Sequence, residues 1–168
     1  MPFLLILMLL FSSCDKQAQD NVSKRQIEAS TIRENRFDPT ILQIEENSRG
    51  TLTSFFRNLN RAASEKNNFF VKYPFLAEPD SSIRTEQLWL SNISYENGDY
   101  YGIVANTPQK ISGISKGSKV VFFTDFITDW MYIQNGKIIG GQSIKYLLEK
   151  IPKNELDFQQ EKILQMFN

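Results

Sequence analysis

The residues of this chain whose types and spacing could do chemistry are concentrated in one short segment. Asp125 and Asp129 lie four residues apart, and Trp130 and Tyr132 follow. Two carboxylates at this spacing can share one face of a helix or a strand. A carboxyl pair whose environments separate their pKa values can act as general acid and general base. Aspartate is also common in turns that precede a strand. We therefore expect a structural role first and assign no catalytic residue.

Tryptophan offers a second kind of chemistry, because it is enriched at the centres of protein interfaces. Trp130 is expected in a strand, where alternation places it on one face with Tyr132 and places Met131 and Ile133 on the other. Both faces are apolar, which predicts a central strand with a helix over one side. Trp89 also falls in an apolar run and can be core or exposed. The candidate motif, structural or partner-binding, is Trp89, Asp125, Asp129, Trp130 and Tyr132.

The composition excludes several kinds of site. The chain has no histidine, which removes the commonest general base and metal ligand near neutral pH. Its one cysteine allows neither an internal disulfide nor a thiolate zinc site. Lysine plus arginine equals aspartate plus glutamate at 19 each, so no general charge draws the chain to nucleic acid. We expect no metal, no cofactor and no nucleic-acid partner.

The single cysteine, Cys14, ends an apolar N-terminal segment. Residues 3–11 are nine apolar residues in a row, FLLILMLLF. This run is shorter than the roughly 20 residues that span a bilayer as a helix, and it fits the apolar region of a secretory signal. The sequence FSSC that follows resembles a bacterial lipobox, whose cysteine becomes the lipidated first residue. We expect residues 1–13 to be the signal peptide, and Cys14 to attach the mature protein to the membrane.

The residues after Cys14 have the composition of a tether. Residues 15–39 are polar and show no apolar periodicity, so they cannot form a core. A flexible coil of this length reaches about 25–30 Å. We expect residues 14–39 to hold a single domain, residues 40–168, clear of the lipid on the periplasmic side of a bacterial envelope. Asp15 resembles a signal for retention in the inner membrane.

The remaining sequence predicts an α+β fold. Apolar residues spaced three and four apart predict an amphipathic helix from Leu52, capped by Thr51 or Thr53 and separated from an earlier apolar segment by a break at Gly50. Strands are expected at residues 69–73, stopped by Pro74, and at 88–93, 100–104, 120–123, 130–133 and 137–139. Asn-Gly at 97–98 and 135–136 predicts two tight hairpins.

Helical spacing returns at residues 144–151, and a terminal amphipathic helix is expected after Pro152. The order helix, about five or six antiparallel strands, helix or helices predicts an α+β domain with its helices on one side of the sheet. Neither a βαβ alternation nor a glycine-rich phosphate loop is present in the sequence, which excludes a Rossmann or P-loop site.

Several segments occur together in an order that resembles a known family. These are SRGTLTSFFRNL, NNFFVKYPF, WLSNI with a following Asn-Gly turn, G-x-V-x-N-x-P, and DWMY-x-x-NGK-x-x-GG. The set spans about residues 48–150 and is similar to the YegJ-like family of bacterial domains of unknown function. The resemblance implies a small α+β domain, in some members with a lipoprotein signal, and it supplies no catalytic residues.

Two classes of function remain open. The first is a non-catalytic binding or accessory module on the envelope with an unknown protein partner, and an immunity protein that captures a toxin is one form of it. The second is a carboxylate-dependent envelope hydrolase acting on a glycan. A pocket containing Asp125 and Asp129 would favour the hydrolase, whereas an apolar surface patch would favour the binding module.

Overall fold

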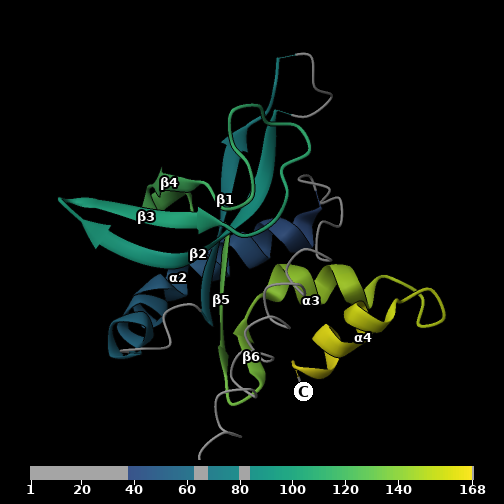
Figure 1. Ribbon diagram of the computed structural model, residues 1–168. Helices are drawn as coiled ribbons and strands as arrows, with labels where there is room; N and C mark the ends of the chain where they lie inside the picture. The colour runs from purple at the N-terminus through teal and green to yellow at the C-terminus, as the bar shows by residue number, and fades with distance from the viewer. Residues whose placement is uncertain (1–37, 63–67, 80–83, 168) are drawn as a thin grey trace, which may run out of the picture.

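The computed structural model describes residues 38–62, 68–79 and 84–167, and these form one antiparallel sheet with helices packed against it (Figure 1). The sheet has six strands in the order β4-β3-β2-β1-β5-β6. The predicted α+β class, with its N-terminal helix, hairpins and C-terminal helices, is confirmed. None of the helices in the described ranges is long and apolar enough to cross a membrane.

The first helix, α2, is continuous from Pro39 to Arg61. Asp38 caps it by accepting a hydrogen bond from the backbone N–H of Thr40 (2.9 Å), and proline suits a first turn that lacks N–H acceptors. The break predicted at Gly50 is wrong, as is the cap at Thr51 or Thr53. Gly50 costs a helix about 1 kcal/mol, and burial of residues on both sides of it offsets that cost. These residues are Ile41, Ser48, Phe55 and Leu59.

Both predicted hairpins are confirmed. Strands β2 (Thr85–Glu96) and β3 (Asp99–Val104) pair across Asn97-Gly98, and β5 (Asp129–Gln134) and β6 (Lys137–Gly140) pair across Asn135-Gly136. The two asparagines have φ angles of 53° and 52° and their glycines 98° and 74°, the positive values that tight hairpin turns require.

Strand β1 (Phe69–Leu76) occupies the centre of the sheet, between β2 and β5. It continues through Pro74, where the sequence predicted its end. Strand β5 pairs only with residues 69–72, whereas β2 pairs as far as Leu76. Pro74 therefore lies where one side of β1 needs no donor, which is the position in which a sheet tolerates proline.

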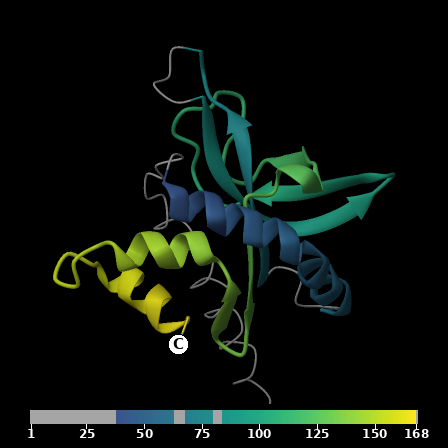
Figure 2. The ribbon, with the colours of Figure 1, turned by 180° about the vertical axis from the view of Figure 1, so that it is seen from behind.

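The edge strand β4 (Lys119–Phe122) connects to β5 by a crossover, residues 123–128, that includes the 3-10 turn Thr124–Phe126. The crossover must pass β3, β2 and β1, because β4 and β5 lie on opposite sides of them in the strand order. Ile127 anchors it, fully buried in the same core cluster as Phe55 of α2. Figure 2 shows the crossover passing α2 near the middle of the helix.

Helices cover both faces of the sheet, so the prediction of helices on one side is wrong. Helix α2 packs on the face that includes Phe69, Val71, Leu88 and Leu90. Helices α3 (Gln142–Glu149) and α4 (Phe158–Gln165) pack on the opposite face. That face includes Phe70, Trp89, Met131 and Ile138. Strands buried on both faces explain the unbroken apolar runs in the sequence.

Candidate functional site

Asp129 is the centre of a buried polar cluster at the start of β5. Its side chain is 1% exposed. One carboxylate oxygen accepts hydrogen bonds from Ser48 Oγ of α2 (3.1 Å) and from the backbone N–H of Trp130 (2.8 Å). The other accepts from the backbone N–H and the Oγ of Ser143 in the first turn of α3 (2.9 and 2.7 Å). Asp129 therefore connects both helical layers to the sheet.

Lys72, from the neighbouring strand β1, adds a cation to this cluster. Its side chain is buried, and Nζ donates to Ser143 Oγ at 3.1 Å. Burial raises the pKa of Asp129 above its ordinary value, while the hydrogen bonds from Ser143 and the charge of Lys72 act in the opposite direction. We call Asp129, Ser48, Lys72 and Ser143 the Asp129 cluster. Its groups satisfy one another, which is how a core accommodates buried charge.

Trp130 extends the contact between β5 and α2. Its indole Nε1 donates to the backbone oxygen of Ser48 and to Thr51 Oγ1, both at 3.1 Å. Its ring lies 5.5 Å from that of Phe55. Gly140 lies directly against this tryptophan. A Cβ atom at Gly140 would meet the backbone oxygen of Trp130 and would approach the Trp130 ring to 2.7 Å. The Asp-Trp and Gly-Gly pairs of the sequence are thus parts of one packing arrangement.

The other two aromatic residues of the predicted motif also serve the core. Tyr132 stacks on Phe69 with ring centroids 4.9 Å apart, and its hydroxyl accepts a hydrogen bond from Asn58 Nδ2 (3.3 Å). Trp89 is buried on the opposite face of the sheet, in the cluster under α3 and α4. Its backbone N–H donates to Asn106 Oδ1 at 2.7 Å.

The structure does not bring the two carboxylates of the motif into one site. Asp125 is exposed on the 3-10 turn, whereas Asp129 is enclosed. Glu86, the other buried acidic residue among those described, accepts from the backbone N–H groups of Gln109 (2.8 Å) and Lys110 (2.8 Å), so it holds a loop. Within the described ranges, acidic side chains and cysteine form no group of three that could hold a metal.

Sequence reasoning missed three members of the Asp129 cluster. Ser48 lies on the buried stripe of α2, Lys72 interrupts an apolar strand at a buried position, and Ser143 follows the Gly-Gly pair. A polar residue at a position that periodicity assigns to the core was the available signal. Cys14 and the predicted signal peptide lie outside the described residues.

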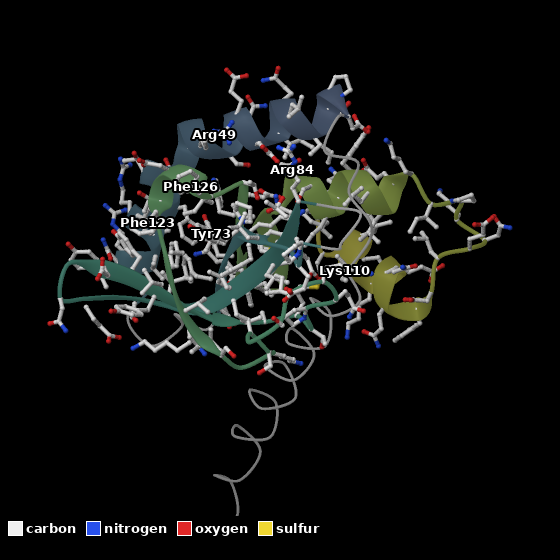
Figure 3. All side chains as sticks on the ribbon, turned by 90° about the horizontal axis from the view of Figure 1, so that it is seen from above. Arg49, Tyr73, Arg84, Lys110, Phe123 and Phe126 are labelled. Carbon is white, nitrogen blue, oxygen red and sulfur yellow. The ribbon has the colours of Figure 1, made fainter. Side chains whose placement is uncertain are left out.

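Two exposed rings on the crossover, Phe123 and Phe126, were not among the candidate residues predicted from the sequence. We call them the ring pair. Each is 58% exposed, and their centroids are 6.5 Å apart in an edge-to-face arrangement. In Figure 3 both lie beside α2, on the side of the molecule where Arg49 and Tyr73 are also labelled. The side chains of the Asp129 cluster are enclosed, whereas the ring pair is available to a partner.

Comparison with known proteins identifies the family of this chain. Residues 38–164 match the family described as "Uncharacterized protein conserved in bacteria (DUF2314)". The uncharacterized protein YegJ of Escherichia coli (strain K12) is 38% identical over 74 residues, which cover 44% of this chain and 48% of that protein. A putative ankyrin repeat protein of Neisseria meningitidis serogroup B is 27% identical over 122 residues, covering 70% of this chain and 48% of that protein.

The chain thus spans about half the length of the curated relatives it matches. No solved structure matches. The matched range begins at the residue that caps α2 and includes every strand of the sheet and nearly all of α4. This protein therefore belongs to the bacterial DUF2314 family and contains a YegJ-like domain of unknown function.

Proposed function

We propose that this protein is a non-catalytic binding module of the bacterial envelope, attached to the membrane through a lipid on Cys14 and directed at a protein partner. The observation that carries the proposal is the contrast between the two parts of the predicted motif. Asp129, the group best suited to chemistry, is enclosed and accepts four hydrogen bonds from within the fold. The ring pair beside it in sequence is exposed.

Exposed aromatic rings are unfavourable in water and are enriched in protein interfaces. The ring pair is supported by the buried Ile127 and Phe122 on either side of it, so it is presented on a rigid part of the fold. A rigid anchor loses little conformational entropy when it binds. These properties support a binding function, in which a toxin-capturing immunity protein and an accessory subunit are two forms.

The location of the module rests on the sequence of the N-terminus. An apolar run ending in Ser12-Ser13-Cys14, followed by a polar tether, supports a lipoprotein on the periplasmic side. Asp15 resembles a retention signal, and this resemblance supports the inner membrane.

Site-specific photocrosslinking of the full chain in native membranes tests the binding function. A benzophenone amino acid replaces Phe126, and a matched control places it at Lys153, an exposed residue between α3 and α4. We expect one discrete adduct from position 126 and none from position 153. Equal adducts from both positions, or none from position 126, contradict a partner at the ring pair.

Metabolic labelling with palmitate tests the anchor. The wild-type chain should incorporate label and partition with membranes, whereas Cys14→Ser should do neither. Equal labelling of the two chains, or no labelling of either, contradicts lipidation at Cys14. This result is independent of the crosslinking result, so each half of the proposal can fail separately.

A further inference from the structure

The C-terminal half of α2 is an exposed basic surface. From Asn47 to Ala62 the chain has Arg49, Arg57 and Arg61 but no aspartate or glutamate. All three arginines are exposed. With Thr53 they follow one another at intervals of four residues, so they form a single row along the helix. Arg49 makes one long contact with Glu45 (3.7 Å) and keeps 45% of its side chain exposed.

This arginine row passes next to the ring pair at Arg49. Phe56 of α2 packs on Tyr100 of β3 (5.0 Å between centroids), and Tyr100 packs on Phe122 of β4 (5.7 Å). The ring pair begins at the residue after Phe122. Figure 2 shows the crossover passing the middle of α2, and Figure 3 labels Arg49 and Phe126 on neighbouring segments. One surface of the domain therefore combines exposed rings with exposed cations.

We propose that this surface, consisting of the arginine row and the ring pair, binds an acidic segment of a protein partner. The inference rests on the proposed binding function and names the surface and the chemistry of its occupant. A guanidinium binds a carboxylate through two parallel hydrogen bonds, and apolar side chains of the segment would cover Phe123 and Phe126. Interface centres are enriched in arginine and aromatic residues together.

Charge complementarity favours an acidic occupant over a neutral or basic one. The named surface contains three arginines and two carboxylates, Asp125 and the Glu45 that contacts Arg49, which leaves one positive charge in excess on a chain whose formal net charge is zero. Such a local excess accelerates association with an acidic partner, and salt weakens the effect.

Fluorescence anisotropy of the full chain with a defined probe tests the inference. The probe is a fluorescein-labelled peptide with three repeats of Asp-Phe-Glu-Leu, and its control has Asn and Gln in place of the acids. We expect saturable binding of the acidic peptide only, weakened by raising salt from 50 to about 300 mM. Arg57→Gln with Arg61→Gln should lower the affinity about fivefold, the loss expected for two exposed ion pairs.

The matched control removes the same charge elsewhere, in Lys137→Gln with Lys153→Gln, both exposed on other elements. This control variant should bind the peptide as the wild type does. Both double variants should have the melting temperature of the wild type, because they alter surface residues. Equal loss in both variants, or no saturable binding, overturns the proposed surface. Binding to phosphatidylglycerol vesicles with the same arginine dependence, in place of the peptide, would assign it to the membrane. A discrete adduct from position 126, together with no arginine dependence of peptide binding, would overturn the acidic occupant and leave the binding function with the ring pair alone.

Discussion

Replacing Asp129 by asparagine is the sharpest test of the structural account, because the change preserves shape and removes only charge and one acceptor. Each carboxylate oxygen accepts one hydroxyl and one backbone N–H. An asparagine oxygen can serve one of these pairs, while its NH₂ group must face the other pair. A serine hydroxyl can rotate to accept, but a backbone N–H cannot, so one buried N–H loses its acceptor.

An unsatisfied buried N–H costs about 1–3 kcal/mol. Asp129→Asn also removes the negative charge that compensates the buried Lys72, while it relieves the cost of burying that negative charge. Taken together, we expect a loss of about 2 kcal/mol in unfolding free energy. For a domain of this size that lowers the melting temperature by about 6–10 °C. This exceeds the loss of about 1 kcal/mol that a turn or cap role would give.

Guanidinium unfolding followed by circular dichroism measures the effect, and the chain supplies its own control. Asp125→Asn makes the same chemical change four residues earlier at an exposed position. It should leave the unfolding free energy within about 0.5 kcal/mol of wild type. The reasoning is refuted if the two variants are equally stable. It is also refuted if Asp129→Asn matches wild type with an unchanged denaturant slope.

Four further outcomes follow from the structure. Burial raises the pKa of Asp129, so as pH falls the folded state takes up a proton before the unfolded state does. Wild type should therefore gain stability relative to Asp129→Asn as pH falls from 7 towards 4. Paired thermal melts of the two proteins measure this change. Hydrogen bonds from Lys150 and Tyr146 hold the pKa of Asp38 well below its ordinary value. Its contribution is therefore fully present above about pH 4 and is lost progressively at lower pH. Asp38→Asn should melt earlier than wild type at pH 7, with a gap that narrows as pH falls from about 4 towards 2. Gly140→Ala should lose about 2–4 kcal/mol in denaturant unfolding because its Cβ meets Trp130, whereas Gly136→Ala, also at positive φ but with open space around it, should lose only about 1 kcal/mol. Trp130→Ala removes a ring and two hydrogen bonds and should cost about 3 kcal/mol in the same assay; a midpoint equal to wild type would mean that the ring does not pack in solution.

The parts of the fold that could be predicted are those determined by neighbouring residues. Asn-Gly pairs specify a turn within four residues, and both hairpins formed where they occur. The helices after Gly141 follow from apolar spacing over two turns. Local propensity failed at Gly50 and Pro74, where tertiary contacts determine the outcome. Helix α2 has buried residues on both sides of Gly50, and β1 has only one paired neighbour at Pro74.

The faces of the sheet could not be predicted because they depend on strand order. Strand β1 pairs with both β2 and β5, although about 50 residues separate the end of β1 from the start of β5. No local pattern indicates that pairing. The same pairing places Lys72 opposite Asp129, so the Asp129 cluster was hidden for the same reason. Trp130 was expected on one face with Tyr132, and the rings do stack there at 6.1 Å.

The sequence motifs of the family resemblance acquire one physical explanation from this arrangement. The SRGT segment supplies Ser48 and Thr51, the VKYPF segment Lys72, the Asp-Trp pair the acceptor and the indole, and the Gly-Gly segment the close approach to the ring. Four separated segments thus meet around Asp129 and Trp130 at the start of β5 and join α2 and α3 to the sheet. Groups committed to that contact cannot also distinguish a partner. Specificity must then come from exposed groups outside that contact, and the arginine row with the ring pair is such a set of groups.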